Sequence, residues 1–146
     1  LNIIGMETLG LRMERVCNNA FRLAQALEKL EGVSVNYPLL ESSPYHELAE
    51  KQLSGKGGAI LTIRAGSKER AYKLINHLKY VKIATNIGDV RTLVIHPAST
   101  IYIHSTPEAM EEAGVYDDTI RISVGIEDIK DLIKDFTEAV ESLGEE

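Results

Sequence analysis

The sequence predicts a single α+β domain, an α/β sandwich in which a small, mostly antiparallel sheet is covered by helices. Segments with helical spacing of apolar residues take turns along the chain with short segments that alternate apolar and polar residues. Several connections between the short segments are too brief for the crossovers that parallel strands need. The chain has 146 residues, the size of one domain with one core, so residues 1–146 are expected to form a single unit.

A long amphipathic helix is expected near the N-terminus, lying across the sheet or leading away from it. Apolar residues recur there at alternating spacings of four and three, in a stripe made of Leu9, Met13, Val16, Ala20, Leu23, Leu27 and Leu30. The helix is expected to end at Gly32, since glycine readily adopts the left-handed conformation of a C-terminal cap. Cys17 lies beside the stripe and is interpreted as a packed hydrophobe, because no helix N-terminus is near enough to activate it as a nucleophile.

Shorter helices and strands are predicted along the rest of the chain. Apolar alternation predicts strands at Val33–Tyr37, Ala59–Ile63, Val81–Asn86, Thr92–His96 and Thr119–Val124. Helical spacing predicts helices at Tyr45–Leu53, Ser67–Lys79, Thr106–Gly114 and Glu127–Leu143. Ser67 and Thr106 are expected N-caps, and Pro107 suits a first helical position. Glu127 and the acidic residues after it are interpreted as partners of the last helix's dipole.

Composition and charge exclude several classes of function. The net charge is −6 and the basic residues are scattered, which argues against nucleic-acid binding. No apolar run approaches the roughly 18 residues of a membrane span, and the start lacks the basic region of a signal peptide. A lone cysteine agrees with a reducing compartment. The protein is therefore expected to be soluble and cytoplasmic.

The residue pattern shows no self-sufficient catalytic, cofactor or metal site. The four histidines are spread widely, and none is paired with another His or Cys at metal-site spacing. Neither a Gly-x-Ser-x-Gly elbow nor a recognisable Cys-His pairing occurs. The glycines of Gly55–Gly58 precede a strand, the reverse of the order in a phosphate-binding loop, so they predict a turn.

Arg121 is the one side chain that the pattern singles out. In the strand Thr119–Val124 the residues Ile120, Ile122 and Val124 point one way, while Arg121 and Ser123 point the other. A guanidinium there is either solvated or paired, and a fixed arginine is well shaped to hold a carboxylate through two hydrogen bonds. An exposed arginine on an edge strand is an equally good interpretation of the alternation.

Five motifs resemble those of one enzyme family. Ile120–Asp128, with the residues Ile-Arg-Ile-Ser-Val-Gly-Ile-Glu-Asp, resembles a signature near the end of the cystathionine synthase/lyase and homoserine sulfhydrylase family, the Cys/Met-metabolism pyridoxal-phosphate enzymes. Thr8–Arg15 resembles the family's Thr-Leu-x-Leu-Arg-Met helix, and Gly55–Gly58 its Gly-x-Gly-Gly turn. Asn86–Asp89 and His96–Thr100 resemble its segment before the final strand. The motifs stand in family order over nearly the whole chain.

The resemblance implies the C-terminal domain of a fold-type I pyridoxal-phosphate enzyme. In that family a large N-terminal domain carries the Schiff-base lysine and the ring-binding residues. None of the nine lysines here lies in the family's Ser-x-Thr-Lys context, so that domain is expected to be absent from this chain and the isolated chain to be inactive. The partners implied are an amino-acid substrate, the N-terminal domain of the same enzyme and further copies in a homo-oligomer.

The resemblance is closest to O-acetylhomoserine sulfhydrylase, which converts O-acetylhomoserine and sulfide to homocysteine and acetate in methionine biosynthesis. By resemblance, Arg121 binds the substrate's α-carboxylate and Asn86 lines the same pocket. Asn86, where many lyases and synthases of the family have Ser, favours the sulfhydrylase branch. Alternatives within the family are a cystathionine or methionine γ-lyase and a cystathionine γ-synthase. A stand-alone, non-catalytic binding module is the alternative of a different class.

Two features set this chain apart from the family pattern. Ile101 and Tyr102 stand where the family commonly has Thr-His, so a hydroxyl that could orient the arginine is lost unless Ser99 or Thr100 substitutes. The first helix also begins without a visible cap, and its apolar residues would normally pack on the missing domain; these are Leu1, Ile3, Ile4 and Met6. The chain is therefore expected to expose apolar surface at its N-terminal end.

Overall fold

The computed structural model describes residues 1–144 and, within them, a five-stranded sheet in the order β1-β2-β5-β4-β3. The strands are β1 (Ser34–Asn36), β2 (Ile60–Arg64), β3 (Lys82–Ile83), β4 (Leu93–Ile95) and β5 (Thr119–Ser123). β1 with β2, β2 with β5 and β5 with β4 pair antiparallel, while β3 and β4 pair parallel. The predicted α+β class with a small, mostly antiparallel sheet is confirmed.

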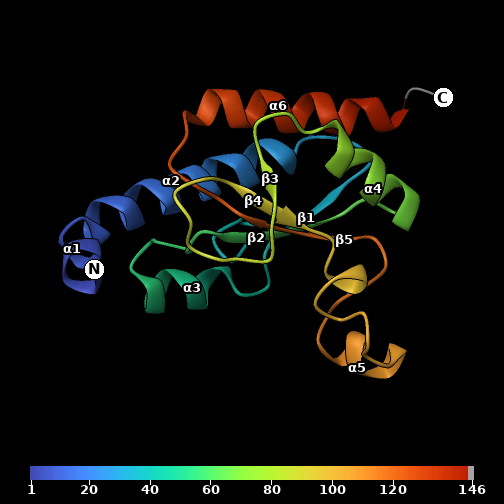
Figure 1. The fold of residues 1–146 in the computed structure, drawn as a ribbon, viewed down its shortest axis with the longest axis horizontal. Helices are drawn as coiled ribbons and strands as arrows, with labels where there is room; N and C mark the ends of the chain where they lie inside the picture. The colour runs from blue at the N-terminus through green and yellow to red at the C-terminus, as the bar shows by residue number, and fades with distance from the viewer. Residues whose placement is uncertain (145–146) are drawn as a thin grey trace.

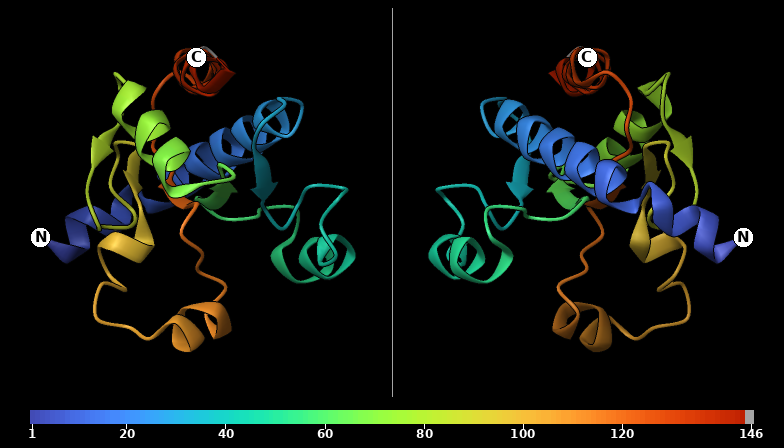
Figure 2. Two further views of the ribbon diagram at one scale, coloured as in Figure 1. Left: turned by 90° about the vertical axis from the view of Figure 1, so that its right-hand side faces the viewer. Right: turned by 90° about the vertical axis from the view of Figure 1, so that its left-hand side faces the viewer.

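The helices are distributed unequally over the two faces of this sheet (Figures 1 and 2). They are α1 (Asn2–Glu7), α2 (Leu9–Leu27), α3 (His46–Leu53), α4 (Lys68–His77), α5 (Pro107–Glu112) and α6 (Ile129–Glu141), with short 3-10 turns at η1 (Pro97–Ser99) and η2 (Ser142–Gly144). α2, α4 and α6 pack together over one face. α3 and the segment that carries α5 lie toward the other face, which we call the open face.

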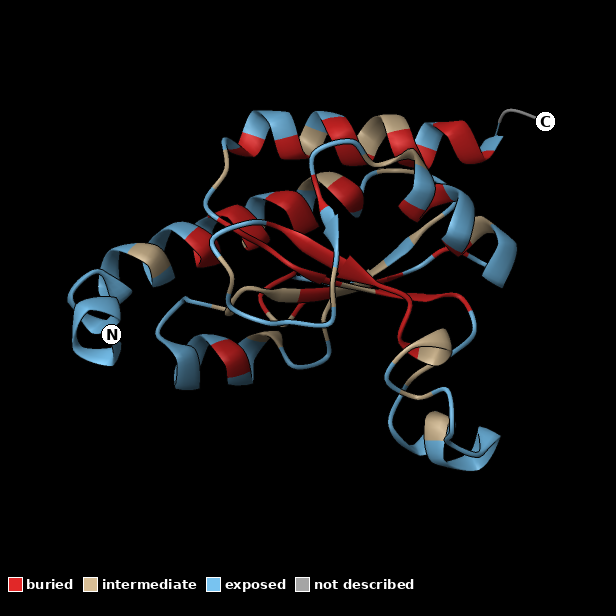
Figure 3. Ribbon diagram, viewed as in Figure 1, coloured by how far each residue is buried: buried red, intermediate tan, exposed pale blue. Residues whose placement is uncertain are grey.

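The hydrophobic core fills the space between the sheet and the three packed helices. In the pairing of β2 with β5, Leu61 stands opposite Ile122 and Ile63 opposite Ile120, and all four are at most 1% exposed. Their helical partners are Leu23, Leu27, Leu74, Leu132 and Phe136, each fully buried. Figure 3 shows this burial concentrated on the strands and on the inner sides of α2 and α6. Burying one such side chain contributes about 1.5–3 kcal/mol, so the core explains why the sheet keeps its register.

The predicted helix starts are confirmed by their capping hydrogen bonds. The Ser67 hydroxyl accepts from the backbone N–H of Arg70 at 3.3 Å, and the Thr106 hydroxyl accepts from Ala109 at 3.3 Å, with Pro107 as the first helical residue. Such caps satisfy N–H groups that have no partner within the helix. Cys17 is buried and free, as expected of a packed hydrophobe.

The predicted long helix is confirmed from Leu9, but the prediction that it ends at Gly32 was wrong. The chain forms two helices separated by Thr8, and α2 ends at Leu27; Gly32, with φ of 90°, lies in the turn that follows. Leu9 and Met13 are 43% and 42% exposed, so the first part of the predicted stripe does not reach the core. The physical reason is visible in Figure 1: α1 and the start of α2 extend past the edge of the sheet, where nothing covers them.

The strand predicted at Val81–Asn86 was also wrong in extent, since β3 comprises only Lys82–Ile83. Residues 84–91 leave the sheet as a loop, which returns the chain to the start of β4. Across this loop β3 pairs with β4 in parallel, which is the one parallel pairing among the described strands of a sheet that was expected to be mostly antiparallel.

Gly125, just after β5, lies in direct contact with this loop. A Cβ built there would lie 2.4 Å from the Val90 carbonyl oxygen and 2.6 Å from the carbonyl carbon of Arg91. Real Cβ atoms do not come so close to backbone, so only glycine allows the loop to pack on the end of β5.

Within the part of the chain that the structure describes, each helix is too short or too polar to cross a bilayer.

Replacing Gly125 with Ala is expected to lower the free energy of unfolding by about 1–3 kcal/mol, because the backbone it would meet must shift. The matched control is Gly10→Ala in α2, where the added Cβ meets no atom within 4 Å. That change should be neutral or stabilise by up to about 1 kcal/mol, since Ala favours helix. Denaturant unfolding measures both variants, and equal losses would contradict the close approach at Gly125.

The chain is expected to self-associate through α1. None of its residues is buried, and Ile3 and Ile4 are 72% and 67% exposed, so an apolar surface faces solvent. Replacing Ile3 and Ile4 with Lys should shift sedimentation profiles toward the monomer. A control pair, Gln52→Lys and Ser105→Lys, adds the same charge at exposed positions elsewhere. A strictly monomeric profile of the unmodified chain at high concentration would show the expectation to be wrong.

Candidate functional site

Arg121 lies in the middle of the sheet, on the open face. It belongs to β5 and stands in register with Thr62 of β2 on one side and Ile95 of β4 on the other. Its neighbours along the strand, Ile120 and Ile122, point into the core and are 0% exposed, so alternation turns Arg121 the opposite way. The edge-strand interpretation is therefore wrong, because β5 is flanked by strands on both sides.

The guanidinium of Arg121 reaches the loop that follows β3. Its Nη2 donates to the carbonyl oxygens of Thr85 at 2.7 Å and Asn86 at 3.3 Å. We call residues 84–91 the carbonyl loop for this reason. The two carbonyls hold one end of the guanidinium in place without neutralising its charge.

The charge of Arg121 has no counterion within residues 1–144. No acidic side chain there forms a salt bridge with it, and its buried Nε has no hydrogen-bond partner. Burial lowers the pKa of Arg121, but an arginine keeps its charge at neutral pH. A buried donor without a partner costs about 1–3 kcal/mol. Arg121 is thus a partly desolvated cation with free donors, suited to bind an anion.

Asn86 meets Arg121 through its main chain. Its carbonyl oxygen accepts from Nη2, while its side chain is exposed and makes no hydrogen bond within the described residues. The structure therefore brings together the two residues that the resemblance pairs in one pocket. No hydrogen bond joins their side chains.

The hydroxyls of Ser99 and Thr100 do not replace the threonine hydroxyl that is lost at Ile101. Ser99 Oγ is hydrogen-bonded to His96 Nδ1 at 2.9 Å, and Thr100 Oγ1 donates to the His96 carbonyl oxygen at 2.8 Å. Ile101 is 52% exposed, in the turn that follows η1. Neither hydroxyl forms a hydrogen bond with Arg121. The carbonyl loop therefore supplies the contacts that orient the guanidinium.

The carbonyl loop is itself held to β5 and to the residues that follow it. Gly88 N–H donates to Ser123 Oγ at 3.3 Å, and Ile126 N–H donates to the Val90 carbonyl at 2.9 Å. Ser123 points to the same side of the sheet as Arg121 and is 1% exposed. The sequence did not indicate that the Ser123 hydroxyl belongs to the site, because the alternation of a strand does not show which loop covers its outer face.

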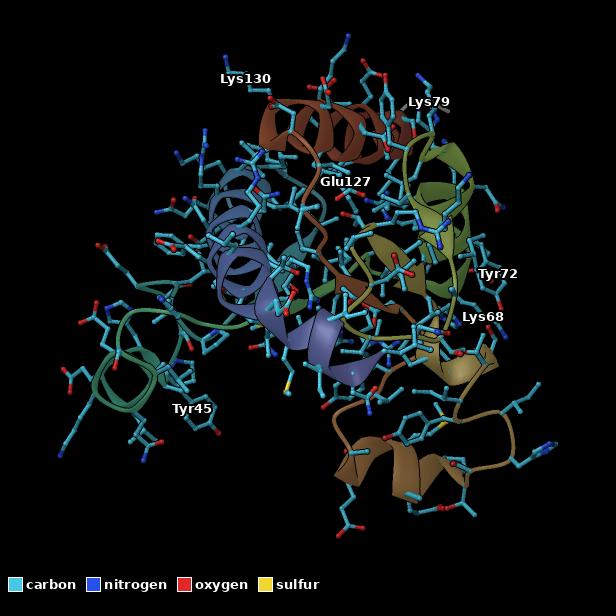
Figure 4. All side chains as sticks on the ribbon, turned by 60° about the vertical axis from the view of Figure 1, so that its left-hand side comes forward. Tyr45, Lys68, Tyr72, Lys79, Glu127 and Lys130 are labelled. Atoms are coloured by element: carbon cyan, nitrogen blue, oxygen red, sulfur yellow. The ribbon has the colours of Figure 1, made fainter. Side chains whose placement is uncertain are left out.

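The interpretation of Glu127 as a partner of the last helix's dipole was wrong. α6 starts at Ile129 with Asp128 as its N-cap, accepting from Lys130 N–H at 2.8 Å. The Glu127 carboxylate instead accepts from both the N–H of Thr92 at 2.5 Å and its hydroxyl at 2.9 Å. Figure 4 shows Glu127 on the segment that leads into α6, beside α2. No periodic pattern could indicate this contact, since the partners are 35 residues apart.

A hollow lies on the open face beside Thr62, which stands in register with Arg121, although Arg121 itself does not line it. Its volume is about 180 Å³, and it is lined by polar residues that include Asn36, Thr62, Arg64 and Thr119. Arg64 already has a carboxylate partner, since its Nε donates to Asp118 at 2.8 Å. Arg121 is therefore the cation on this part of the sheet whose charge is not compensated.

Metal binding finds no support in the part of the chain that the structure covers, because no group of three or more His, Cys, Asp or Glu side chains is placed to hold an ion there.

Known proteins resemble this chain over almost its whole length. A family model described as Cys/Met metabolism PLP-dependent enzyme matches residues 1–141. A homocysteine synthase of Schizosaccharomyces pombe is 48% identical over 139 residues, covering 94% of this chain and 32% of that protein. An L-methionine gamma-lyase of Treponema denticola is 41% identical over 140 residues, covering 95% of this chain and 35% of that protein.

A solved structure agrees with these relatives. The putative O-acetylhomoserine (thiol)-lyase of Campylobacter jejuni, solved with a pyridoxyl-lysine phosphate, matches with a TM-score of 0.90 and 36% identity, over 94% of this chain and 33% of that one. The chain thus spans about one third of the length of the relatives it matches. On this evidence the chain belongs to the family of Cys/Met metabolism enzymes that depend on pyridoxal phosphate.

Proposed function

We propose that this chain is the substrate-carboxylate-binding domain of an O-acetylhomoserine sulfhydrylase, which makes homocysteine and acetate from O-acetylhomoserine and sulfide. The observation that carries the proposal is Arg121, a partly buried cation with a free Nε and no acidic partner among residues 1–144. An amino-acid carboxylate supplies the missing negative charge and accepts hydrogen bonds from the planar guanidinium.

The residues of this chain fit a supporting role in that reaction. Pyridoxal phosphate, when bound, supplies an electron sink for bonds broken at the substrate's carbons. Arg121 would hold the α-carboxylate and so fix the orientation of the Cα–H bond, while the exposed side-chain amide of Asn86 lies at the same end of the site. Two carbonyl contacts keep the guanidinium oriented before the substrate arrives, which reduces the entropy lost on binding.

The cofactor lysine is proposed to lie outside this chain. The chain covers about a third of its relatives, and none of its nine lysines stands in the family's Ser-x-Thr-Lys context. The partners proposed are therefore a cofactor-carrying domain of the same enzyme and other copies in a homo-oligomer. A cytoplasmic location stays a prediction.

A γ-lyase acting on methionine is the second candidate, because one relative at 41% identity carries that name. Asn86 supports the sulfhydrylase. Assays of the complete protein with O-acetylhomoserine plus sulfide, and separately with methionine or cystathionine, distinguish the two. Homocysteine formed in the first assay supports the proposal. Consumption of methionine or cystathionine without homocysteine synthesis from O-acetylhomoserine would overturn it.

Replacing Arg121 with Ala in the complete protein is expected to lower kcat/KM for the amino acid roughly a hundredfold, or about 3 kcal/mol, mostly through KM. Lys at this position should recover only part of the loss, because an ammonium keeps the charge but not the paired hydrogen bonds. Arg22→Ala, on the exposed surface of α2, is the matched control and should change neither constant. An unchanged KM in Arg121→Ala, in a folded protein, would contradict the carboxylate role.

Adding pyridoxal phosphate to the purified chain is expected to give no dialysis-resistant absorbance band above roughly 400 nm, because the lysine that forms the Schiff base is proposed to lie elsewhere. The complete protein, treated in the same way, should keep such a band and serves as the control. A stable band with this chain alone would show that one of its own lysines forms the cofactor site.

A further inference from the structure

We propose that Thr92 and Glu127 are positioning residues: together they set where the carbonyl loop stands against Arg121, and so how the guanidinium is presented to a carboxylate. The inference rests on the proposed function for its effect on substrate binding. The hydrogen bonds that carry it do not depend on that function.

Thr92 directly follows the carbonyl loop, and the Glu127 carboxylate accepts hydrogen bonds from the backbone N–H and the hydroxyl of Thr92. In the first half of the loop, the carbonyl oxygens of Thr85 and Asn86 accept hydrogen bonds from Arg121. At the other end of the loop, the Glu127 carboxylate holds Thr92 in place. The Thr92 hydroxyl also accepts from Gly125 N–H at 3.0 Å, so this one side chain links the loop to the end of β5. Thr92 is 0% exposed, and water cannot replace these contacts.

Helix α2 fixes the other side of the pair. The buried Asn19 side chain donates to the carbonyl oxygens of Gly125 at 3.0 Å and Glu127 at 2.9 Å. Arg15 adds bonds to the carbonyls of Ile126 at 3.3 Å and Glu127 at 3.2 Å. In Figure 4 Glu127 lies between α2 and the strands, as these bonds require. Through these hydrogen bonds the position of the carbonyl loop is fixed relative to α2, the longest of the described helices.

Both members of the pair are polar, so neither adds buried apolar surface to the hydrophobic core. Apart from this pair, the loop is tied to the 123–126 segment by the hydrogen bonds at Gly88 and Val90. Loss of the Thr92 hydroxyl should thus loosen the loop, and with it the carbonyls that orient Arg121, while the sheet stays folded.

The test compares Thr92→Val, which removes the hydroxyl at nearly constant volume, with Thr92→Ser, which restores it. In the complete protein Thr92→Val should raise KM for the amino-acid substrate roughly tenfold and change kcat less than about twofold. Hydrogen exchange of the loop's amides, measured on the chain itself, should become faster, most of all at Gly88. Thr92→Ser should bring both values back toward the original.

Ser142→Ala is the matched control, because it removes another buried hydroxyl hydrogen bond, from Ser142 Oγ to the Ala139 carbonyl at 2.8 Å, far from the loop in sequence. It should leave KM and loop exchange unchanged. If Thr92→Val does not fold, Glu127→Gln replaces it in the same comparison. The glutamine NH₂ group can only donate, so this variant keeps one of the two acceptors that hold Thr92 and loses the other.

Faster exchange with an unchanged KM would overturn the inference, since the pair would then be structural only. Unchanged exchange would overturn it as well. The failure of the proposed function looks different: Arg121→Ala itself would leave KM unaltered, whatever Thr92→Val does to loop exchange.

Discussion

The register of β5 between β2 and β4 is the constraint on which the rest of the structure depends. With Leu61 opposite Ile122 and Ile63 opposite Ile120, one side of β5 closes the core. Arg121, between the two isoleucines, must then face the open side. A slip of one residue would bury the guanidinium in the core and expose the isoleucines, so the apolar packing protects the functional residue's position as well as the fold.

The polar contacts around Arg121 complete what this register begins. A central strand determines the side to which a side chain points, but not the direction of a long, flexible guanidinium. Here the Thr85 and Asn86 carbonyls take that role, and the loop that carries them packs on Gly125, where a Cβ would not fit. The resulting cation is oriented but not neutralised, which is the state that an anionic ligand requires.

Sequence patterns predicted the elements that bury a regular face. The alternation of Ile120 and Ile122 and the capping by Ser67 and Thr106 correspond to observed contacts, because each depends on residues close in the chain. Leu9 and Met13, the early part of the helical stripe, were expected to be buried but are exposed, because periodicity shows only that a face is apolar. Whether that face is covered depends on how far the sheet extends.

The sequence by itself determined the α+β class, the face of the strand on which Arg121 lies and, through its motifs, the family. Tertiary structure alone decided that β5 is internal, that Arg121 lacks a carboxylate within residues 1–144 and that Glu127 binds Thr92 instead of serving α6. The reason is physical: local periodicity arises from neighbours a few residues apart, whereas these contacts join segments about 35 residues apart in sequence, which only the packed sheet and loop bring together.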